Sequence, residues 1–443
     1  MIDTGLVREV RQDRRNSTSR LVLDWCSRAS TKQRAGRAGR VRAGVCCKLF
    51  SSRTASLLRK QTIPELQRVP LEEVCLSVLA SKLATNCMEF LRQAPEPPSE
   101  ESVRVALQVL TEVGALQTGR GGADTLSPLG EHLAKLPVHP RLGKMLLYGS
   151  LFRTIHPILS VVATLSTKSP FVTAVDNATE AKARHKAFQH ESSDFLTMTN
   201  VWDAFTQEGS VTGDRGRKFC RRNVLSWTTL MEIGDLRRQL LELMGQIGFV
   251  DRTLREDDVE RSRYNTCGRN EQIVHAVICA GLFPNVAQAV KEGSIISSPP
   301  ALCHRRERLY FRNSSVNHNK TMMKLGSDWI LFHEKFATGR TTVSVTSPVN
   351  PVALVLFGNN VVVKHLERTV TVDEWMDLPM PAQTGVSLRQ QRDRLGGLLR
   401  QRLQTGHNDQ MTVGMNKSSG SDTNDKEESE ETIVGIVSEL LCS

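Results

Sequence analysis

The stretch Ser30–Arg40, with the sequence STKQRAGRAGR, contains the residues that decide what kind of fold this chain has. Ser30 is followed three residues later by Gln33, and this capping box predicts that a helix begins here. Gly36 and Gly39 lie inside the expected helix. Each glycine costs about 1 kcal/mol relative to alanine in a helix interior. The two glycines therefore predict that another group approaches the backbone closely.

Arginines recur at every third position of the same stretch, at Arg34, Arg37 and Arg40. Residues three apart share a sector of a helix, and the planar guanidinium fork matches phosphate oxygens. A solvated basic face is the alternative interpretation, but such a face would have no use for the two glycines or for Gln33. The stretch therefore predicts a capped helix that presents arginines to a polyphosphate.

Residues 33–40, QRAGRAGR, resemble motif VI of superfamily 2 helicases in its DEAH/DExH form. The resemblance implies that Gln33 lies near the γ-phosphate of ATP and the attacking water. It implies that Arg37 and Arg40 are catalytic arginine fingers, which stabilise charge on the transferring phosphoryl group. Arg34 would complete the ATP-binding set and hold two motor lobes in register. The implied cofactors are ATP and Mg²⁺, the latter held by a first motor lobe.

The composition favours a polyanionic partner inside the cell. The chain has 443 residues, enough for two to four domains, and a formal net charge of +11. Its ten cysteines are scattered without metal-ligand spacing, which is typical of reduced thiols in the cytoplasm or nucleus. No metal site and no membrane segment are expected, because no apolar run approaches about 18 residues.

The beginning of the chain resembles the final third of a second RecA-like helicase lobe, over residues 1–62. Ile2–Gly5 resembles the strand that follows motif V in DEAH/DExH helicases. Residues 21–26 and 44–50 are apolar and predict two further strands. The expected fold class is a multidomain chain with an α/β part, an α part and a β part.

Helices dominate the pattern over residues 63–283. Apolar spacing predicts helices near 71–78 and 99–113, followed by a short hairpin whose turn contains the glycines of 119–122. This order resembles a winged-helix domain, over residues 63–137. Residues 138–283 resemble the helical ratchet, or helicase-associated, domain. Its opening motif LPVHPRLGKML contains Lys144, which the resemblance places against RNA. A basic stretch over residues 215–222 is either an RNA contact or a solvated helix face.

Strand patterns follow over residues 284–383 and resemble an OB-fold domain. The expected strands include residues 308–311, 329–332, 341–345 and 353–357. The resemblance implies that Lys335, Arg340 and Thr341 contact phosphates of single-stranded RNA. Ser314–Asn317 resembles the SSVN part of a family loop.

The C-terminal part divides into an amphipathic helix over residues 384–404 and an acidic tail over residues 405–443. Leu388, Leu395, Leu399 and Leu403 form the expected inner face of the helix. The tail is rich in Gly, Ser, Asp and Glu, which predicts disorder over most of its length.

Two functions remain open from the sequence. Neither a P-loop nor a DEAH motif is present in these 443 residues, and both are needed to bind ATP and Mg²⁺. The first hypothesis is a fragment of an ATP-dependent RNA helicase that unwinds or remodels RNA in the 3′-to-5′ direction. This chain alone would then be inactive, and a protein activator or ribonucleoprotein would be a further partner. The second hypothesis is a non-catalytic RNA-binding or regulatory module. A helicase acting on DNA is a weaker third option.

Overall fold

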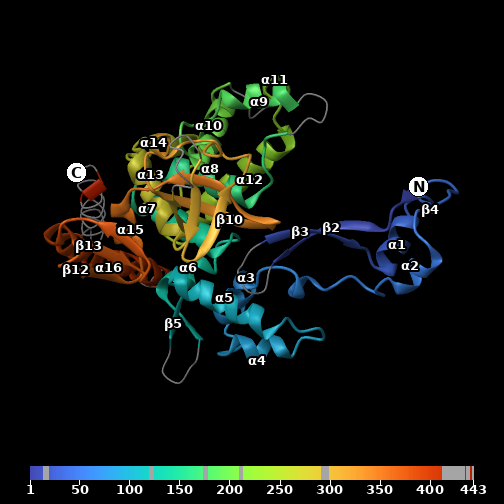
Figure 1. Ribbon diagram of the computed structural model, residues 1–443, viewed down its shortest axis with the longest axis horizontal. Helices are drawn as coiled ribbons and strands as arrows, with labels where there is room; N and C mark the ends of the chain where they lie inside the picture. The colour runs from blue at the N-terminus through green and yellow to red at the C-terminus, as the bar shows by residue number, and fades with distance from the viewer. Residues whose placement is uncertain are drawn as a thin grey trace.

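The structure is a computed structural model that describes residues 1–12, 19–118, 124–172, 178–208, 213–290 and 299–411, together with residues 435, 440 and 441. The glycine turn at 119–122 and the acidic tail beyond residue 411, apart from those three residues, lie outside this part. The N-terminal segment projects from the rest of the molecule, at the right of Figure 1. It contains a two-stranded parallel sheet, two helices and a hairpin: β1 (Ile2–Asp3), β4 (Cys47–Lys48), α1 (Arg28–Ala35), α2 (Ser52–Leu57), β2 (Leu6–Gln12) and β3 (Ser19–Trp25).

Helix α1 begins earlier than the capping box predicted. Its N-cap is Ser27, whose side-chain oxygen accepts a hydrogen bond from the Ser30 backbone N–H at 3.1 Å. The helix ends at Ala35, and Gly36 is its C-cap. Arg37 and Arg40 therefore lie in the turn that follows the helix, so the prediction of three arginines on one helical face was wrong. Ser30 has the same capping chemistry as Ser27, but it is the Ser27 hydroxyl that lies 3.1 Å from the Thr62 hydroxyl.

Residues 63–137 form helices and a hairpin in the predicted order. Gly114, in a left-handed conformation, ends the long helix, and the two hairpin strands pair directly after it. The inner face of the long helix is buried through Val103, Leu110 and Val113. The elements are η1 (Glu65–Gln67), α3 (Glu72–Ala80), α4 (Cys87–Arg92), α5 (Glu100–Val113), β5 (Leu116–Thr118), β6 (Asp124–Leu126) and α6 (Pro128–Leu133).

A helical bundle occupies the centre of the molecule (Figure 1). Helices α7 and α13 pack closely at Gly281, where there is no room for a larger residue. A Cβ on Gly281 would lie 2.6 Å from the Cβ of Met145 and 2.9 Å from the carbonyl oxygen of Arg141. Helix α8 packs against α7, α10 and α12. The elements are α7 (Pro140–Leu151), α8 (Ile155–Ser166), α9 (Ala178–Lys186), α10 (Asp194–Gln207), α11 (Asp214–Asn223), α12 (Trp227–Gln246), η2 (Glu256–Arg261), η3 (Arg263–Asn265) and α13 (Glu271–Leu282).

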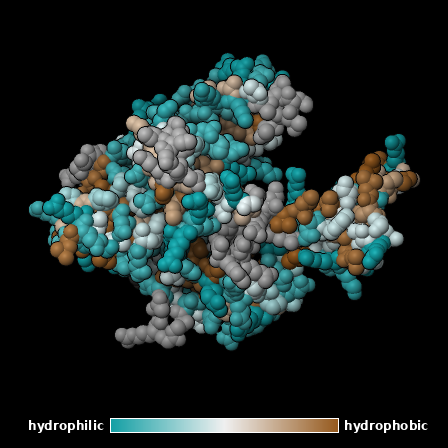
Figure 2. All heavy atoms as spheres, viewed as in Figure 1, coloured by the Kyte–Doolittle hydropathy of each residue, from teal (hydrophilic) through white to brown (hydrophobic). Residues whose placement is uncertain are grey.

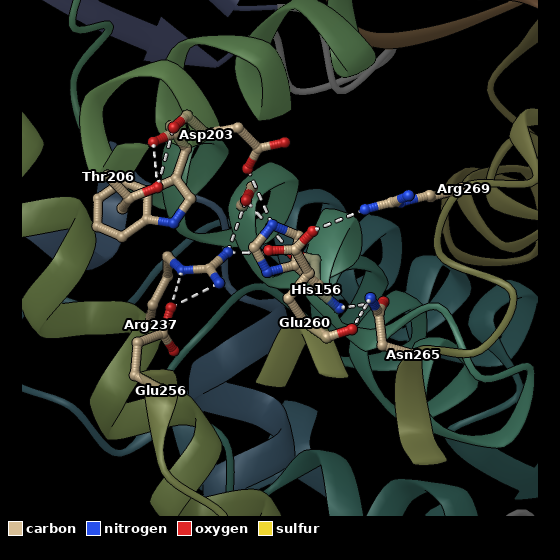
Figure 3. Close-up of polar contacts among 10 residues, drawn as sticks. His156, Asp203, Thr206, Arg237, Glu256, Glu260, Asn265 and Arg269 are labelled. Carbon is tan, nitrogen blue, oxygen red and sulfur yellow. Dashed lines mark hydrogen bonds and ion pairs between the residues drawn. The ribbon is translucent and has the colours of Figure 1, made fainter. Parts of the chain in front are cut away.

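A buried arginine joins four elements of this bundle (Figure 3). Arg237 of α12 is fully buried, and its guanidinium donates to Glu256 at 2.6 Å, to the Ser160 hydroxyl at 2.6 Å and to the His156 carbonyl at 3.1 Å. The guanidinium also lies 5.0 Å from the ring centre of Trp202 on α10. These contacts pair the buried charge with Glu256 and join α8, α10, α12 and η2 to one another.

A closed barrel of five strands follows the bundle. Strand β10 pairs with β7 on one side and with β11 on the other, and β11 also pairs with β9, so the sheet closes on itself. The N-terminal strand β3 meets β10 through a single parallel pairing of Ser19 with Phe336. The elements are β7 (Val286–Val290), β8 (Ala301–His304), β9 (Glu307–Phe311), α14 (Met322–Leu325), β10 (Trp329–Thr338) and β11 (Arg340–Pro348).

The expected strand at residues 353–357 is in fact a helix, α15 (Pro351–Phe357). Asn350 caps it, since its side-chain oxygen accepts from the Val352 N–H at 2.9 Å, and Pro351 occupies the first turn. The four apolar residues from Ala353 to Leu356 are buried consecutively because the helix is covered on several sides. The Asn-Pro pair was the overlooked helix-start signal.

The last described elements are a separate three-stranded sheet and a long helix. The sheet contains β12 (Val361–Lys364), β13 (Thr369–Val372) and β14 (Met376–Pro379), which do not join the barrel. Helix α16 spans Ala382–Met411 and therefore continues into the segment expected to be tail. Its predicted inner face is buried: Leu388, Leu395, Leu399 and Leu403.

The Ser314–Asn317 motif joins the barrel to the helical bundle. The Asp194 carboxylate, at the start of α10, accepts hydrogen bonds from the Val316 N–H at 2.8 Å, the Ser315 hydroxyl at 2.7 Å and the Thr346 N–H at 2.7 Å. Burial raises the pKa of Asp194, and these donors oppose that rise. The motif thus holds the barrel against α10.

Candidate functional site

Arg34 ties helix α1 to the first strand. Its guanidinium donates to the Asp3 carboxylate at 3.0 Å and to the Leu6 carbonyl at 3.1 Å. The Asp3 side chain is 2% exposed and also accepts from the Gly5 N–H at 2.9 Å. Arg34 therefore makes structural contacts inside the N-terminal segment. These contacts hold helix α1, and with it the start of the motif, against β1.

The other predicted nucleotide-binding residues face solvent. Gln33, Arg37 and Arg40 are all exposed, on the end of α1 and in the turn after it. The two glycines predicted to allow close approach meet no crowding within the chain: a Cβ on Gly36 would meet its nearest atom at 3.5 Å, and one on Gly39 would meet nothing within 4 Å. The close approach occurs instead at Gly44, where a Cβ would lie 2.1 Å from the Ala38 carbonyl oxygen. The turn is thus packed against Gly44 on the side of Ala38 and open to solvent at Gly39.

A large cavity of about 910 Å³ lies where α3, α5, α7 and the barrel meet. Of the four predicted RNA-binding residues, only Lys335 lines it. The Lys335 ammonium lies 2.9 Å from the Glu307 carboxylate and 5.7 Å from the ring centre of Phe332. Lys335 is therefore in place at the cavity wall with a carboxylate beside it.

The remaining predicted RNA-binding residues lie elsewhere. Arg340 is exposed at the start of β11, with its guanidinium 5.3 Å from the ring centre of Tyr310. Thr341 is half-buried beside it. The Lys144 ammonium donates to the Val113 carbonyl at 3.0 Å, and burial lowers its pKa to about 8. Lys144 thus faces a backbone carbonyl between α7 and α5, and not the cavity.

Charges of both signs line the cavity. Two cations are paired with carboxylates, Arg141 with Glu112 at 3.5 Å and Lys335 with Glu307 at 2.9 Å. The ionisable groups on the wall are the cations Arg141, Arg305, Arg306 and Lys335 and the carboxyls Glu72, Glu73, Glu112, Glu307 and Glu334. Burial raises the pKa of Glu72 and Glu334, which favours their neutral forms. The wall therefore carries little net charge.

Three histidines on the wall are neutral at pH 7. Burial lowers the pKa of His139 to about 3, and it lowers those of His304 and His333 to about 4. Neighbouring cations add to the effect, Arg141 beside His139 and His333 and Lys335 beside His304. Sequence reasoning missed these residues. His139 and Arg141 belong to the quoted LPVHPRLGKML motif, but nothing in the sequence places them opposite His304 and His333.

These histidines make folding stability depend on pH. The ordinary pKa of histidine is about 6.5, so at a pH above this value the imidazoles are mostly neutral in both the folded and the unfolded chain. Between about 6.5 and about 4 only the unfolded chain binds the protons, so stability falls as the pH falls. Each histidine contributes at most about 1.4 kcal/mol per pH unit in this window. Urea unfolding at a series of pH values should show this slope, and His333→Gln should reduce it. Equal slopes in the two proteins would mean that folded His333 binds its proton as readily as the unfolded chain does.

Neither a metal cluster nor a membrane span is found in the described residues. No group of three or more His, Cys, Asp or Glu side chains is arranged there to hold a metal ion. No helix among them has the length and apolar character needed to cross a membrane.

Two family models match the chain at the bundle and the barrel. The ratchet-like helicase-associated domain matches residues 139–198, and the oligonucleotide/oligosaccharide-binding fold matches residues 274–361. Three relatives can be aligned with most of the length of this chain. The ATP-dependent DNA/RNA helicase DHX36 of Homo sapiens is 34% identical over 92% of this chain. The ATP-dependent RNA helicase DHX29 of Homo sapiens is 31% identical over 91%, and the putative ATP-dependent RNA helicase DHX57 of Mus musculus is 33% identical over 85%. Over most of its own length, the chain is thus similar to ATP-dependent RNA helicases.

The match to these helicases covers only part of each relative. The chain spans 40% of the DHX36 protein and 29% of the DHX29 and DHX57 proteins. The two regions of this chain that the family models match meet at the cavity, because His139 and Arg141 come from the first and His304 and Lys335 from the second. The cavity is thus a junction of helicase-associated and OB-fold elements.

Proposed function

We propose that this chain is the C-terminal part of an ATP-dependent RNA helicase that moves 3′ to 5′ along RNA. The observation that carries the proposal is the exposed set of Gln33, Arg37 and Arg40, held by the Arg34–Asp3 ion pair with open space in front of Gly39. Exposed guanidinium groups on a rigid turn suit the charged phosphates of a nucleotide bound on a facing lobe.

The exposed apolar side chains of the N-terminal segment support the proposal that a further lobe covers this surface. Its large apolar side chains are exposed to an unusual degree, as Figure 2 shows at the right, where the segment lies. Val41, Val45, Leu49 and Leu57 are 99%, 76%, 63% and 77% exposed. A parallel pair of two-residue strands is also too small to stand alone, since parallel sheets are normally covered on both faces. In the proposal, residues 1–62 complete a second RecA-like lobe, and residues 63–137 form the winged-helix domain beside it.

The nucleotide chemistry follows from which groups this chain supplies. ATP bound to a facing lobe would present its γ-phosphate to Arg37 and Arg40, with Gln33 near the attacking water. Mg²⁺ would be held by carboxylates of the facing lobe and would neutralise phosphate charge there. In the proposal this chain supplies donors, and because its sequence contains no P-loop to cradle a triphosphate, it should not hydrolyse ATP by itself.

The cavity is the proposed place for single-stranded RNA. Its wall offers donors from Arg305, Arg306 and Lys335 but carries little net charge, which fits a moving strand better than a tightly held one. Arg340 and Thr341, on the strand next to β10, would contact phosphates outside the cavity. In the proposal, a protein activator or a ribonucleoprotein is a further partner.

Removing two of these cations tests the RNA path. The double variant Lys335→Ala with Arg340→Ala should bind single-stranded RNA more weakly and with a salt slope smaller by about 1.4, since each phosphate contact contributes about 0.7. Fluorescence anisotropy of a labelled RNA at several KCl concentrations measures both quantities. Arg389→Ala with Arg394→Ala, two exposed cations of α16, is the matched control and should leave both unchanged. If the two double variants bind alike, RNA does not follow this wall.

A further inference from the structure

Helices α9 and α11 form a small lobe at the end of the helical bundle, at the top of Figure 1. We call these two helices, Ala178–Lys186 and Asp214–Asn223, the basic tip. The lobe has its own hydrophobic cluster, separate from the main core, which includes Phe188, Trp202, Phe205, Phe219 and Leu225. The His185 ring nitrogen Nε2 lies 3.0 Å from the Val224 carbonyl oxygen and links the two helices at their base.

The basic tip concentrates positive charge. Its two helices contain eight cations and two carboxylates, against a net charge of +11 for the whole chain. All eight cations are exposed: Lys182, Arg184, Lys186, Arg215, Arg217, Lys218, Arg221 and Arg222. Three of them have carboxylate partners, Arg184 with Glu180, Lys218 with Asp214 and Arg222 with Glu208. These pairs are solvent-exposed and weak, so the surface keeps a strong positive potential.

Folding does not explain this charge. Arg217 with Arg221 and Lys218 with Arg222 are like-charged pairs four residues apart, and each such pair costs a helix about 0.2–0.5 kcal/mol. Arg215 also lies in the first turn of α11, where the helix dipole disfavours cations. The buried face of α11 needs only Gly216, Phe219 and Cys220. A helix selected for stability alone would carry mixed signs on its outer face.

The surface suits a phosphate backbone better than an acidic protein. Protein interfaces depend on apolar or aromatic anchors, but the described residues of the two helices present no large apolar side chain to solvent. Phe219 is buried, and Arg217 lies over the Trp227 ring with 5.9 Å to its centre. A phosphodiester backbone needs only exposed charge and guanidinium forks. The absence of exposed rings on these helices also argues against base stacking.

We propose that the basic tip is a second RNA-binding surface that contacts the phosphodiester backbone, without sequence preference, outside the cavity. The proposal rests on the proposed function for the identity of the polyanion. Helix α5, which lines the cavity, lies on the opposite side of the bundle from α11 in Figure 1. No described residue of α9 or α11 lines the cavity, so an RNA that fills the cavity would need additional length to reach the tip. The tip would hold the strand or duplex that lies outside the channel.

The test compares two charge-neutralised variants on short and long RNA. Lys182→Gln, Arg215→Gln and Arg221→Gln remove three exposed cations of the tip. Arg389→Gln, Arg394→Gln and Arg400→Gln remove three exposed cations of α16 and form the control. Anisotropy is measured between about 50 and 200 mM KCl. The probes are an RNA of about 8 nucleotides, within the range of OB-fold site sizes, and one several times longer.

The tip variant should lose about 2 from the salt slope on the long RNA, since three contacts contribute about 0.7 each, and should bind the short RNA like the wild type. The control should match the wild type on both. Equal binding of the long RNA by the tip variant and the control would overturn the proposal while leaving the cavity path intact. Equal binding of the long RNA by the tip variant and the wild type, together with weaker binding of labelled polyglutamate by the tip variant, would overturn it in favour of an acidic protein. If the tip variant binds the long RNA more weakly but the Lys335 and Arg340 double variant binds RNA normally, the tip proposal stands and the proposed RNA path through the cavity is rejected.

Discussion

Arg40→Ala should reduce RNA-stimulated ATP hydrolysis by about a thousandfold or more in a protein that joins this chain to the proposed facing lobe. Arginine fingers contribute about 10³–10⁵ to the turnover of phosphoryl-transfer enzymes. Arg40 is exposed, in a turn fixed from behind by Gly44, so its removal should leave the fold unchanged. RNA affinity should change little, because Arg40 does not line the cavity. Steady-state ATPase assays with and without RNA measure the first quantity and anisotropy measures the second.

Arg42→Ala is the matched control for this experiment. Arg42 is exposed and lies two residues farther along the same turn, so the variant loses the same charge from nearly the same place. It should keep near-normal turnover. Strand displacement from a duplex with a 3′ overhang should be lost with Arg40→Ala and kept with Arg42→Ala. Unchanged turnover of the Arg40 variant would contradict the arginine-finger role. The absence of ATPase activity in every variant and in the wild type would favour the non-catalytic RNA-binding module.

Local sequence signals located the motif but not its local geometry. The spacing in residues 33–40 is enough to find the motif, because the chemistry resides in consecutive residues. The start of α1 was misplaced because Ser27 and Ser30 cap equally well on local grounds. The choice is made by contacts with residues far along the chain, such as the Arg28 N–H donating to the Arg59 carbonyl at 2.8 Å. Helix α15 was misassigned because four consecutive apolar residues fit a buried strand and a covered helix alike.

The cavity could not be derived from sequence for a different reason. Its wall combines Glu72, Glu112, His139, His304 and His333, which are separated by up to 261 positions and meet only through tertiary packing. No periodicity links them. Lys335 and Lys144 were both predicted from the family resemblance, but only Lys335 lines the cavity, whereas Lys144 turns toward the Val113 carbonyl. Side-chain direction decided between them, and sequence alone does not fix it.

Arg237→Met should destabilise the helical bundle by about 3–5 kcal/mol, the usual cost of removing one member of a buried ion pair. Arg237 is fully buried, and the Glu256 side chain is 16% exposed. Replacing the guanidinium leaves Glu256 as a largely buried carboxylate without its cation. It also removes the guanidinium as a donor to the Ser160 hydroxyl and to the His156 carbonyl, although that carbonyl still accepts from the Ser160 hydroxyl at 3.3 Å. The packing over Trp202 is retained by the methionine side chain. Urea unfolding followed by circular dichroism measures the loss.

The double variant Arg237→Met with Glu256→Leu separates the ion pair from packing. Replacing both partners of a buried pair with apolar groups is often neutral or stabilising, because no desolvated charge remains. The double variant should therefore be more stable than Arg237→Met alone, and the two single changes should show strong coupling. If the effects of the two changes simply add, Arg237 acts through packing against Trp202 and not through its charge. Coupling would instead mean that the charge itself holds α8, α10, α12 and η2 in register. In that case the bundle that forms one wall of the cavity is positioned by electrostatics that only the folded interior makes strong.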